Sequence, residues 1–100
     1  MSNLVLEIRT PDKEIFRGEV DQVILPGKEG LFGVLKNHAP MIATLQKGNV
    51  KVDAIKVDNY SYDAGQGEMK SDPNKDKHFN FEIEGGVVEV LNNKVIVLAS

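Results

Sequence analysis

The chain has 100 residues, of which 12 are Lys or Arg and 15 are Asp or Glu, and its formal net charge is -3. This length supports one domain over residues 1–100, because two hydrophobic cores cannot be built from so short a chain. The absence of cysteine excludes disulfides, thiolate catalysis and cysteine-ligated metal sites. The acidic excess argues against a nucleic-acid-binding surface. No apolar run approaches the roughly 20 residues that span a bilayer, so we expect no direct insertion into lipid.

Apolar residues alternate with polar ones through the first half of the chain, which predicts β-strands. Pro26-Gly27 follows the third of these strands, and this residue pair is typical of the centre of a type II turn. A corner is predicted at 37–40, where Pro40 favours an extended residue before it. The predicted strands of this half are 4–9, 15–16, 20–25, 31–35 and 41–45.

The second half continues the same period with two irregularities. The apolar pattern changes face twice between Val50 and Tyr62, which predicts bulges in that strand. From residue 63 to about 78 the sequence is polar apart from Ala64 and Met69, and we expect a long loop there. The predicted strands that follow are 79–83, 87–91 and 94–98.

Two further features concern the C-terminal strands. Asn92-Asn93 lies between them and predicts a tight hairpin, because asparagine tolerates positive φ. The continuous apolar run at 95–98 predicts a strand covered on both faces. No window has a sustained helical period, so the sequence predicts an all-β sandwich or barrel.

No arrangement of residues in the sequence predicts catalysis or metal binding. The two histidines, His38 and His78, are isolated in a chain without cysteine. No serine lies in a nucleophile pattern, and the glycines around Lys28 lack the following Ser or Thr and the helix of a phosphate-binding loop. We therefore predict no catalytic residue, no metal and no cofactor. His38 remains open as either a structural corner or a partner contact.

Three segments of the chain resemble the epsilon subunit of F-type ATP synthases. The opening has Thr10-Pro11 and Phe16-Arg17-Gly18-Glu19-Val20. The stretch from Val23 to Gly48 contains Pro-Gly-x-x-Gly and His-Ala-Pro, and the end, from Gly85 to Ala99, contains Gly-Gly-x-x-Glu-Val. Each motif alone is weak, but their combination, order and spacing cover most of the chain.

The resemblance implies a flattened β-sandwich of about ten short strands. It implies a non-catalytic subunit of the central stalk, or rotor, of a proton-translocating ATP synthase, which helps to couple ion flow to ATP synthesis. The implied partners are the gamma subunit and the ring of c subunits, within the whole complex at the cytoplasmic face of the bacterial inner membrane. By this resemblance the c-ring contact consists of Gly27, Lys28, Glu29, Gly30 and Leu31, and the gamma contact of His38 and Met41.

The chain departs from the family pattern at several positions. Leu31 stands where family members often have an acidic residue, which makes the expected ring contact more apolar. Lys36-Asn37 replaces a Pro-Gly pair, and Glu84 replaces a small residue. Many family members continue into two C-terminal helices that can inhibit ATP hydrolysis. This sequence ends at Ser100 with no C-terminal helical hairpin, so we expect helix-mediated inhibition by this chain to be absent. Two alternatives stay open: a naturally short epsilon subunit, or the N-terminal domain of a longer one.

Two other classes of protein stay open on the residues alone. One is a free-standing β-sandwich module that binds a protein or a glycan, with Tyr60 and Tyr62 as its exposed aromatic pair. Such pairs are more often core or hairpin packing. The other is a small enzyme, which the shortage of nucleophiles, bases and metal ligands disfavours.

Overall fold

The structure is a computed structural model that describes residues 3–60, 67–71 and 77–100. These residues form nine strands and no helix, so the all-β prediction is confirmed. It follows that no described segment is a helix able to cross a membrane. The strands are β1 (Leu4–Arg9), β2 (Glu14–Gly27), β3 (Gly30–Leu35), β4 (Met41–Leu45), β5 (Gly48–Tyr60), β6 (Gly67–Ser71), β7 (Lys77–Ile83), β8 (Gly86–Leu91) and β9 (Lys94–Ala99).

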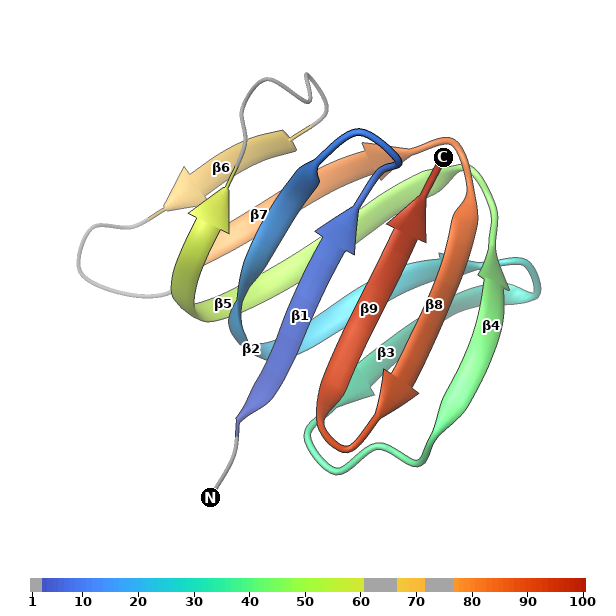
Figure 1. Cartoon of the computed structure of the whole chain (residues 1–100), viewed down its shortest axis with the longest axis horizontal. Coiled ribbons are helices and arrows are strands. Elements are labelled where there is room, and N and C mark those ends of the chain that lie inside the picture. The colour runs from blue at the N-terminus through green and yellow to red at the C-terminus, as the bar shows by residue number, and fades with distance from the viewer. Residues whose placement is uncertain (1–2, 61–66, 72–76) are drawn as a thin grey trace.

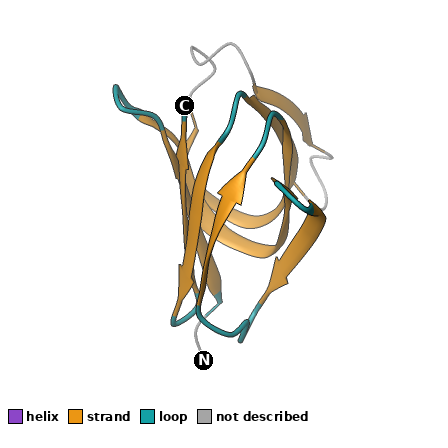
Figure 2. Ribbon diagram, turned by 90° about the vertical axis from the view of Figure 1, so that its right-hand side faces the viewer, coloured by secondary structure: helices purple, strands orange, loops and turns teal. Residues whose placement is uncertain are grey.

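The strands pack as two layers, which Figure 1 shows from the front and Figure 2 from the side. One layer has the order β1-β9-β8-β4, and the other has β3-β2-β5-β7-β6. The first half of β2 also pairs with β1, so this strand joins the two layers. The molecule measures 35 × 33 × 23 Å, in agreement with the predicted flattened sandwich.

Strand β2 is continuous, whereas the sequence predicts two strands that end and restart around Gly18. The error has a physical reason. A Cβ atom at Gly18 would clash with the backbone oxygen of Lys56 on β5. Glycine therefore permits a close approach of two strands here and does not end one.

The predicted bulges of the 50–62 segment are present within its described part. In the register of β5 with β2, Ile55 and Asp58 have no partner, and each extra residue reverses the face of those that follow. Side chains therefore point inward at Val50, Val52 and Ala54, then at Val57, then at Tyr60.

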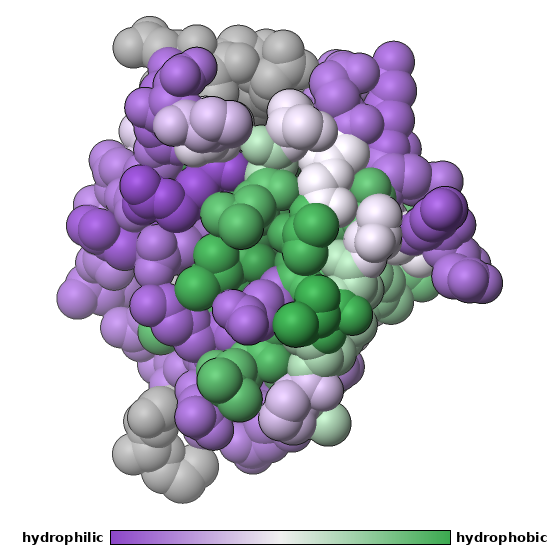
Figure 3. Space-filling view, turned by 45° about the vertical axis from the view of Figure 1, so that its right-hand side comes forward, coloured by the Kyte–Doolittle hydropathy of each residue, from purple (hydrophilic) through white to green (hydrophobic). Residues whose placement is uncertain are grey.

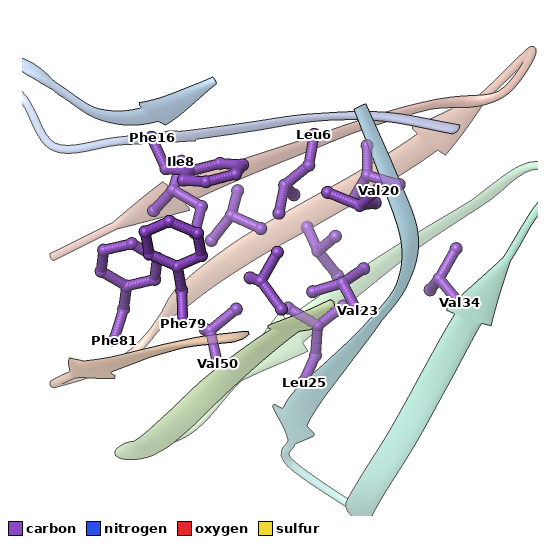
Figure 4. Packing of buried hydrophobic residues seen from close by; sticks show 14 of the residues in the cluster. Leu6, Ile8, Phe16, Val20, Val23, Leu25, Val34, Val50, Phe79 and Phe81 are labelled. Carbon is purple, nitrogen blue, oxygen red and sulfur yellow. The ribbon is translucent and has the colours of Figure 1, made fainter. Parts of the chain in front are cut away.

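The core lies between the layers and has an aromatic cluster at one end (Figure 4). The ring of Phe16 on β2 meets Phe79 and Phe81 on β7 edge to face, with centroids 5.2 and 5.8 Å apart. Tyr60 packs against the same pair at 4.9 and 5.7 Å. The ring of Tyr60 is therefore part of the core and is not an exposed binding surface. Tyr62 lies outside the described residues.

The C-terminal hairpin forms as predicted, with φ of 50° at Asn92 and 61° at Asn93. The prediction that the next strand is covered on both faces is wrong. Val95 and Val97 are buried, but Leu98 is 55% exposed on the outer face of β9. Nothing in the described part of the chain lies over that face.

The predicted loop at 63–78 also differs from the structure. Gly67–Ser71 forms β6, which pairs antiparallel with β7, and β7 itself begins at Lys77. A strand added at a sheet edge is held by main-chain hydrogen bonds and needs no apolar alternation, so the polar sequence did not indicate it. The rest of the predicted loop, residues 63–66 and 72–76, lies outside the described residues.

Candidate functional site

The hairpin between β2 and β3 carries the five residues predicted to contact the c-ring. Gly27 pairs with Gly30, so the turn consists of Lys28 and Glu29 and is not centred on Pro26-Gly27 as predicted. The residue with positive φ is Gly30, at 131°. Lys28, Glu29, Gly30 and Leu31 are exposed, and Leu31 most conspicuously, at 71%.

Contacts with the next strand hold this hairpin against the sandwich. Lys28 donates its backbone N–H to Thr44 O at 3.1 Å, and Gln46 donates to Pro26 O at 2.9 Å. Gly27 is buried, and it has no room for a side chain. A Cβ atom there would lie 2.7 Å from Gly30 O and 2.8 Å from the Phe32 ring. The turn is therefore a fixed projection of the fold.

Gly30→Ala is expected to lower the free energy of unfolding by about 1–3 kcal/mol. The reason is conformational alone, because no atom lies within 4 Å of the position a Cβ would take at Gly30. Urea unfolding measures the change. Gly33→Ala is the matched control, because Gly33 has no positive φ and a Cβ there would meet atoms no closer than 3.9 Å. Equal stabilities of the two variants would contradict the assigned role of Gly30.

An open hollow of about 300 Å³ is lined by both the hairpin and β4. Phe32 of β3 and Met41 and Ala43 of β4 line it with apolar groups, and all three are half-buried. We call this the β3–β4 hollow. It brings Met41, predicted to contact gamma, to the same side of the molecule as the predicted c-ring residues.

His38, the other residue predicted to contact gamma, lies apart from the hollow. It is half-buried in the corner between β3 and β4, and its Nδ1 lies 2.7 Å from Ala39 O. Two amide contacts tie this corner to the β8–β9 hairpin. Asn37 donates its backbone N–H to Asn93 Oδ1 at 2.6 Å, and Asn93 Nδ2 donates to Asn37 Oδ1 at 3.3 Å.

The outer side of the β4-β8-β9 sheet carries the feature that sequence analysis missed, an apolar surface (Figure 3). Val87 lies beside Leu98 in the strand register, and Ile42 and Ile96 flank Glu89 from either side. Ile42 is the most exposed large apolar residue described, at 73%. We define the apolar face as Ile42, Val87, Leu91, Ile96 and Leu98.

One charged residue, Glu89, lies within the apolar face between Ile42 and Ile96, and other charged groups border the face along β1. Lys94 Nζ lies 3.2 Å from Glu7 Oε2, and Arg9 lies 3.8 Å from the other oxygen of Glu7. Exposed pairs of this kind contribute little to stability. They give the apolar face a hydrophilic rim along β1, an arrangement typical of surfaces that bind other proteins.

A polar cluster that includes a histidine lies on the opposite layer. Asp53 accepts a hydrogen bond from Gln22 Nε2 at 2.7 Å, and its second oxygen lies 2.6 Å from His78 Nδ1. This contact links three neighbouring strands. Within the described residues no three His, Asp or Glu side chains converge as metal ligands would.

Fold and surface together define an all-β sandwich domain whose outward features are an apolar face, a projecting hairpin and a hollow between two strand edges. The profile of one family, described as ATP synthase, Delta/Epsilon chain, beta-sandwich domain, matches residues 3–75. The chain belongs to this family, and the resemblance read from its motifs is confirmed.

Individual relatives support the assignment. An ATP synthase epsilon chain of Chlorobium limicola is 41% identical over 93% of this chain and 84% of its own length. One from Leptospira borgpetersenii is 36% identical over 95% of this chain, which spans only 59% of that relative. Epsilon chains are stalk or regulatory subunits, so the chain is a non-catalytic member of its family.

Solved structures show the same fold at low identity. A chain in the central stalk and c-ring structure of the Tetrahymena thermophila mitochondrial ATP synthase aligns with a TM-score of 0.69 at 18% identity, over 98% of this chain and 63% of that one. A chain in the Euglena gracilis mitochondrial ATP synthase aligns with a TM-score of 0.68 at 20% identity, over 99% of this chain and 51% of that one.

Proposed function

We propose that this chain is a central-stalk subunit of a proton-translocating ATP synthase. It binds the gamma subunit and the c-ring, turns with them, and helps to couple ion flow to ATP synthesis. The complex holds it peripherally at the cytoplasmic face of a bacterial inner membrane. The observation that carries this proposal is the apolar face, considered together with the family of the chain.

The apolar face is the proposed contact with gamma. A small monomeric domain rarely leaves this many large apolar side chains together in water, and such a surface is stabilised when a partner covers it. Ile42 extends the predicted gamma contact from Met41 to the outer side of β4. Met41 itself points inward, so its part in the contact is confined to the β3–β4 hollow.

The β2–β3 hairpin is the proposed contact with the c-ring. It is a rigid projection that presents Lys28 and Glu29 next to the exposed Leu31. The two opposite charges can pair with polar groups of a ring loop, and Leu31 adds apolar area where family members often carry an acid. His38 remains a proposed gamma contact through the corner that Asn37 and Asn93 hold.

The alternative of a free-standing glycan-binding module lacks a described aromatic platform. Tyr60, the residue nominated for it, packs against Phe79 and Phe81 in the core. Sugar recognition needs an aromatic face exposed to the ligand, which Tyr60 does not offer.

Titration of the chain with purified gamma subunit from the same organism tests the proposal. We expect a one-to-one complex by native mass spectrometry and a negative heat-capacity change of binding by calorimetry, because apolar area is buried. Both partners are first shown to be folded by circular dichroism. Absence of a complex would overturn the proposed function.

A further inference from the structure

We propose that an extended segment of the gamma subunit pairs with the free edge of β3 as an additional β-strand. The inference rests on the proposed function and specifies the form of part of that contact. Among the described elements, β3 pairs with β2 alone, so one edge of Gly30–Leu35 has no strand beside it.

The strand register determines which backbone groups face that edge. Pro26 pairs with Leu31, has no N–H, and directs its carbonyl to Gln46 N on the β4 side. Pro26 and Leu31 are therefore a non-hydrogen-bonded pair of the antiparallel ladder. Alternation then turns the N–H and C=O groups of Leu31, Gly33 and Leu35 away from β2.

One of these groups is already used. The Leu35 carbonyl accepts a hydrogen bond from His38 N at 3.2 Å. The N–H groups of Leu31, Gly33 and Leu35 and the carbonyls of Leu31 and Gly33 remain on the open edge. They form an alternating row of donors and acceptors, which an extended backbone complements.

The edge lacks the features that usually prevent strand pairing. Natural edge strands are commonly protected by charges, proline or a bulge. The sequence from Gly30 to Leu35 has no charged residue and no proline, and its register with β2 has no shift. Leu31 is 71% and Leu35 56% exposed, with Gly33 between them on the same side of the strand.

These side chains also define what the added segment looks like. The Leu31 side chain belongs to the proposed c-ring contact and only its backbone to this edge. Leu35 offers an apolar contact to the added segment, and Gly33 leaves a gap beside it for a side chain of the partner. Lys28 and Glu29, of opposite charge, precede one end of β3, and Lys36 follows the other end. Charge complementarity therefore favours an uncharged, apolar strand with an acidic residue at the end that meets Lys36.

Continuity with the proposed gamma surface indicates that the segment comes from gamma. The β3–β4 hollow joins Phe32 of β3 to Met41 of β4, and Ile42, the residue after Met41, belongs to the apolar face. Met41 and Ile42 lie on opposite sides of β4, which is the last strand of its layer. A protein docked on the apolar face therefore reaches the hollow and the β3 edge by passing around β4.

Amide hydrogen exchange measured by NMR, on the free chain and on its complex with gamma, tests the inference. We expect the amides of Leu31, Gly33 and Leu35 to exchange readily in the free chain and to slow at least about tenfold in the complex. Phe32 and Val34 are the internal reference, because their amides bond to β2 in both states.

A complex in which the three edge amides stay fast would overturn the inference and leave the proposed function intact. Failure to form any complex would overturn both. Protection that appears in the free chain as its concentration rises would identify a second copy as the occupant.

A pair of substitutions at one position gives an independent measurement. Gly33→Pro removes an edge N–H that bonds to nothing in the fold, and proline is tolerated at such edge positions. Gly33→Ala keeps the N–H and has room for its methyl group, since the nearest atom to a Cβ there is 3.9 Å away. We expect the Kd for gamma to rise about tenfold or more with proline and less than about threefold with alanine. Equal affinities of two folded variants would overturn the inference.

Discussion

Replacing Phe16 by alanine is expected to lower the free energy of unfolding by about 3–5 kcal/mol. Phe16 is fully buried on β2, the strand that joins both layers. Its ring meets Phe79 and Phe81 edge to face, an arrangement that adds about 0.5–1.5 kcal/mol per pair to the burial of area. Truncation leaves a cavity between the layers that the β-sheet backbone cannot close.

Urea denaturation followed by circular dichroism measures this loss. For a domain of this size the thermal midpoint should fall by well over 10 °C, since each kcal/mol shifts it by about 4–8 °C. Phe16→Leu keeps most of the volume and should cost under about 2 kcal/mol, so it remains measurable if the alanine variant does not fold. Leu98→Ala, which truncates an exposed residue, is the control and should stay within about 1 kcal/mol of the parent. A Phe16→Ala variant as stable as this control would contradict the described core.

The parts of the fold that were predicted correctly are those where one local rule decides the outcome. Period-two alternation places Leu6 and Phe81 inside, because side chains of a strand alternate between its faces whatever it pairs with. The Asn92-Asn93 hairpin follows from the tolerance of asparagine for positive φ. The bulges in β5 could be predicted because an extra residue moves all later side chains to the other face, and that change is visible in the apolar pattern of the strand itself.

The errors fall where tertiary contacts choose between local alternatives. Pro26-Gly27 suits a type II turn. Backbone hydrogen bonds of Pro26 and Lys28 to the β4 side extend β2 through Gly27, so the turn lies two residues later, at Lys28-Glu29. Gly18 marks a close crossing of two strands, a reason for glycine that only the partner strand reveals.

The candidate site was predicted only in part for a related reason. An apolar run such as 95–98 has the same sequence whether its second face is covered by another layer of the same domain or by another protein. The motif resemblance selected Met41, which the structure turns inward, and passed over the exposed Ile42 next to it. Both faces of β8 and β9 are largely apolar in the sequence, with Glu89 and Lys94 as the charged exceptions. In a two-layer fold, where one face of each sheet meets solvent, that pattern is itself a signal of a binding surface.

Ile42→Glu is expected to weaken binding of the chain to the gamma subunit by about 30-fold or more, which corresponds to at least about 2 kcal/mol. The new carboxylate would be buried next to Glu89, a like charge, once gamma covers the apolar face, and an unpaired buried charge is costly. Leu98→Glu should act in the same direction. Because both positions are exposed in the free chain, its thermal midpoint should change little.

Ile55→Glu is the matched control for this prediction. It makes the same chemical change at an exposed isoleucine, but on β5 in the opposite layer. Calorimetric titration of the variants against gamma separates the two surfaces. If Ile42→Glu binds like the parent while Ile55→Glu does not, gamma contacts the β2-β5-β7 layer and the assignment of the apolar face is wrong. If both bind like the parent, the contact with gamma is confined to the edge strands and the corner at His38. The assignment of the apolar face to gamma therefore requires that Ile42→Glu and Leu98→Glu bind gamma more weakly than the parent and that Ile55→Glu binds it equally well.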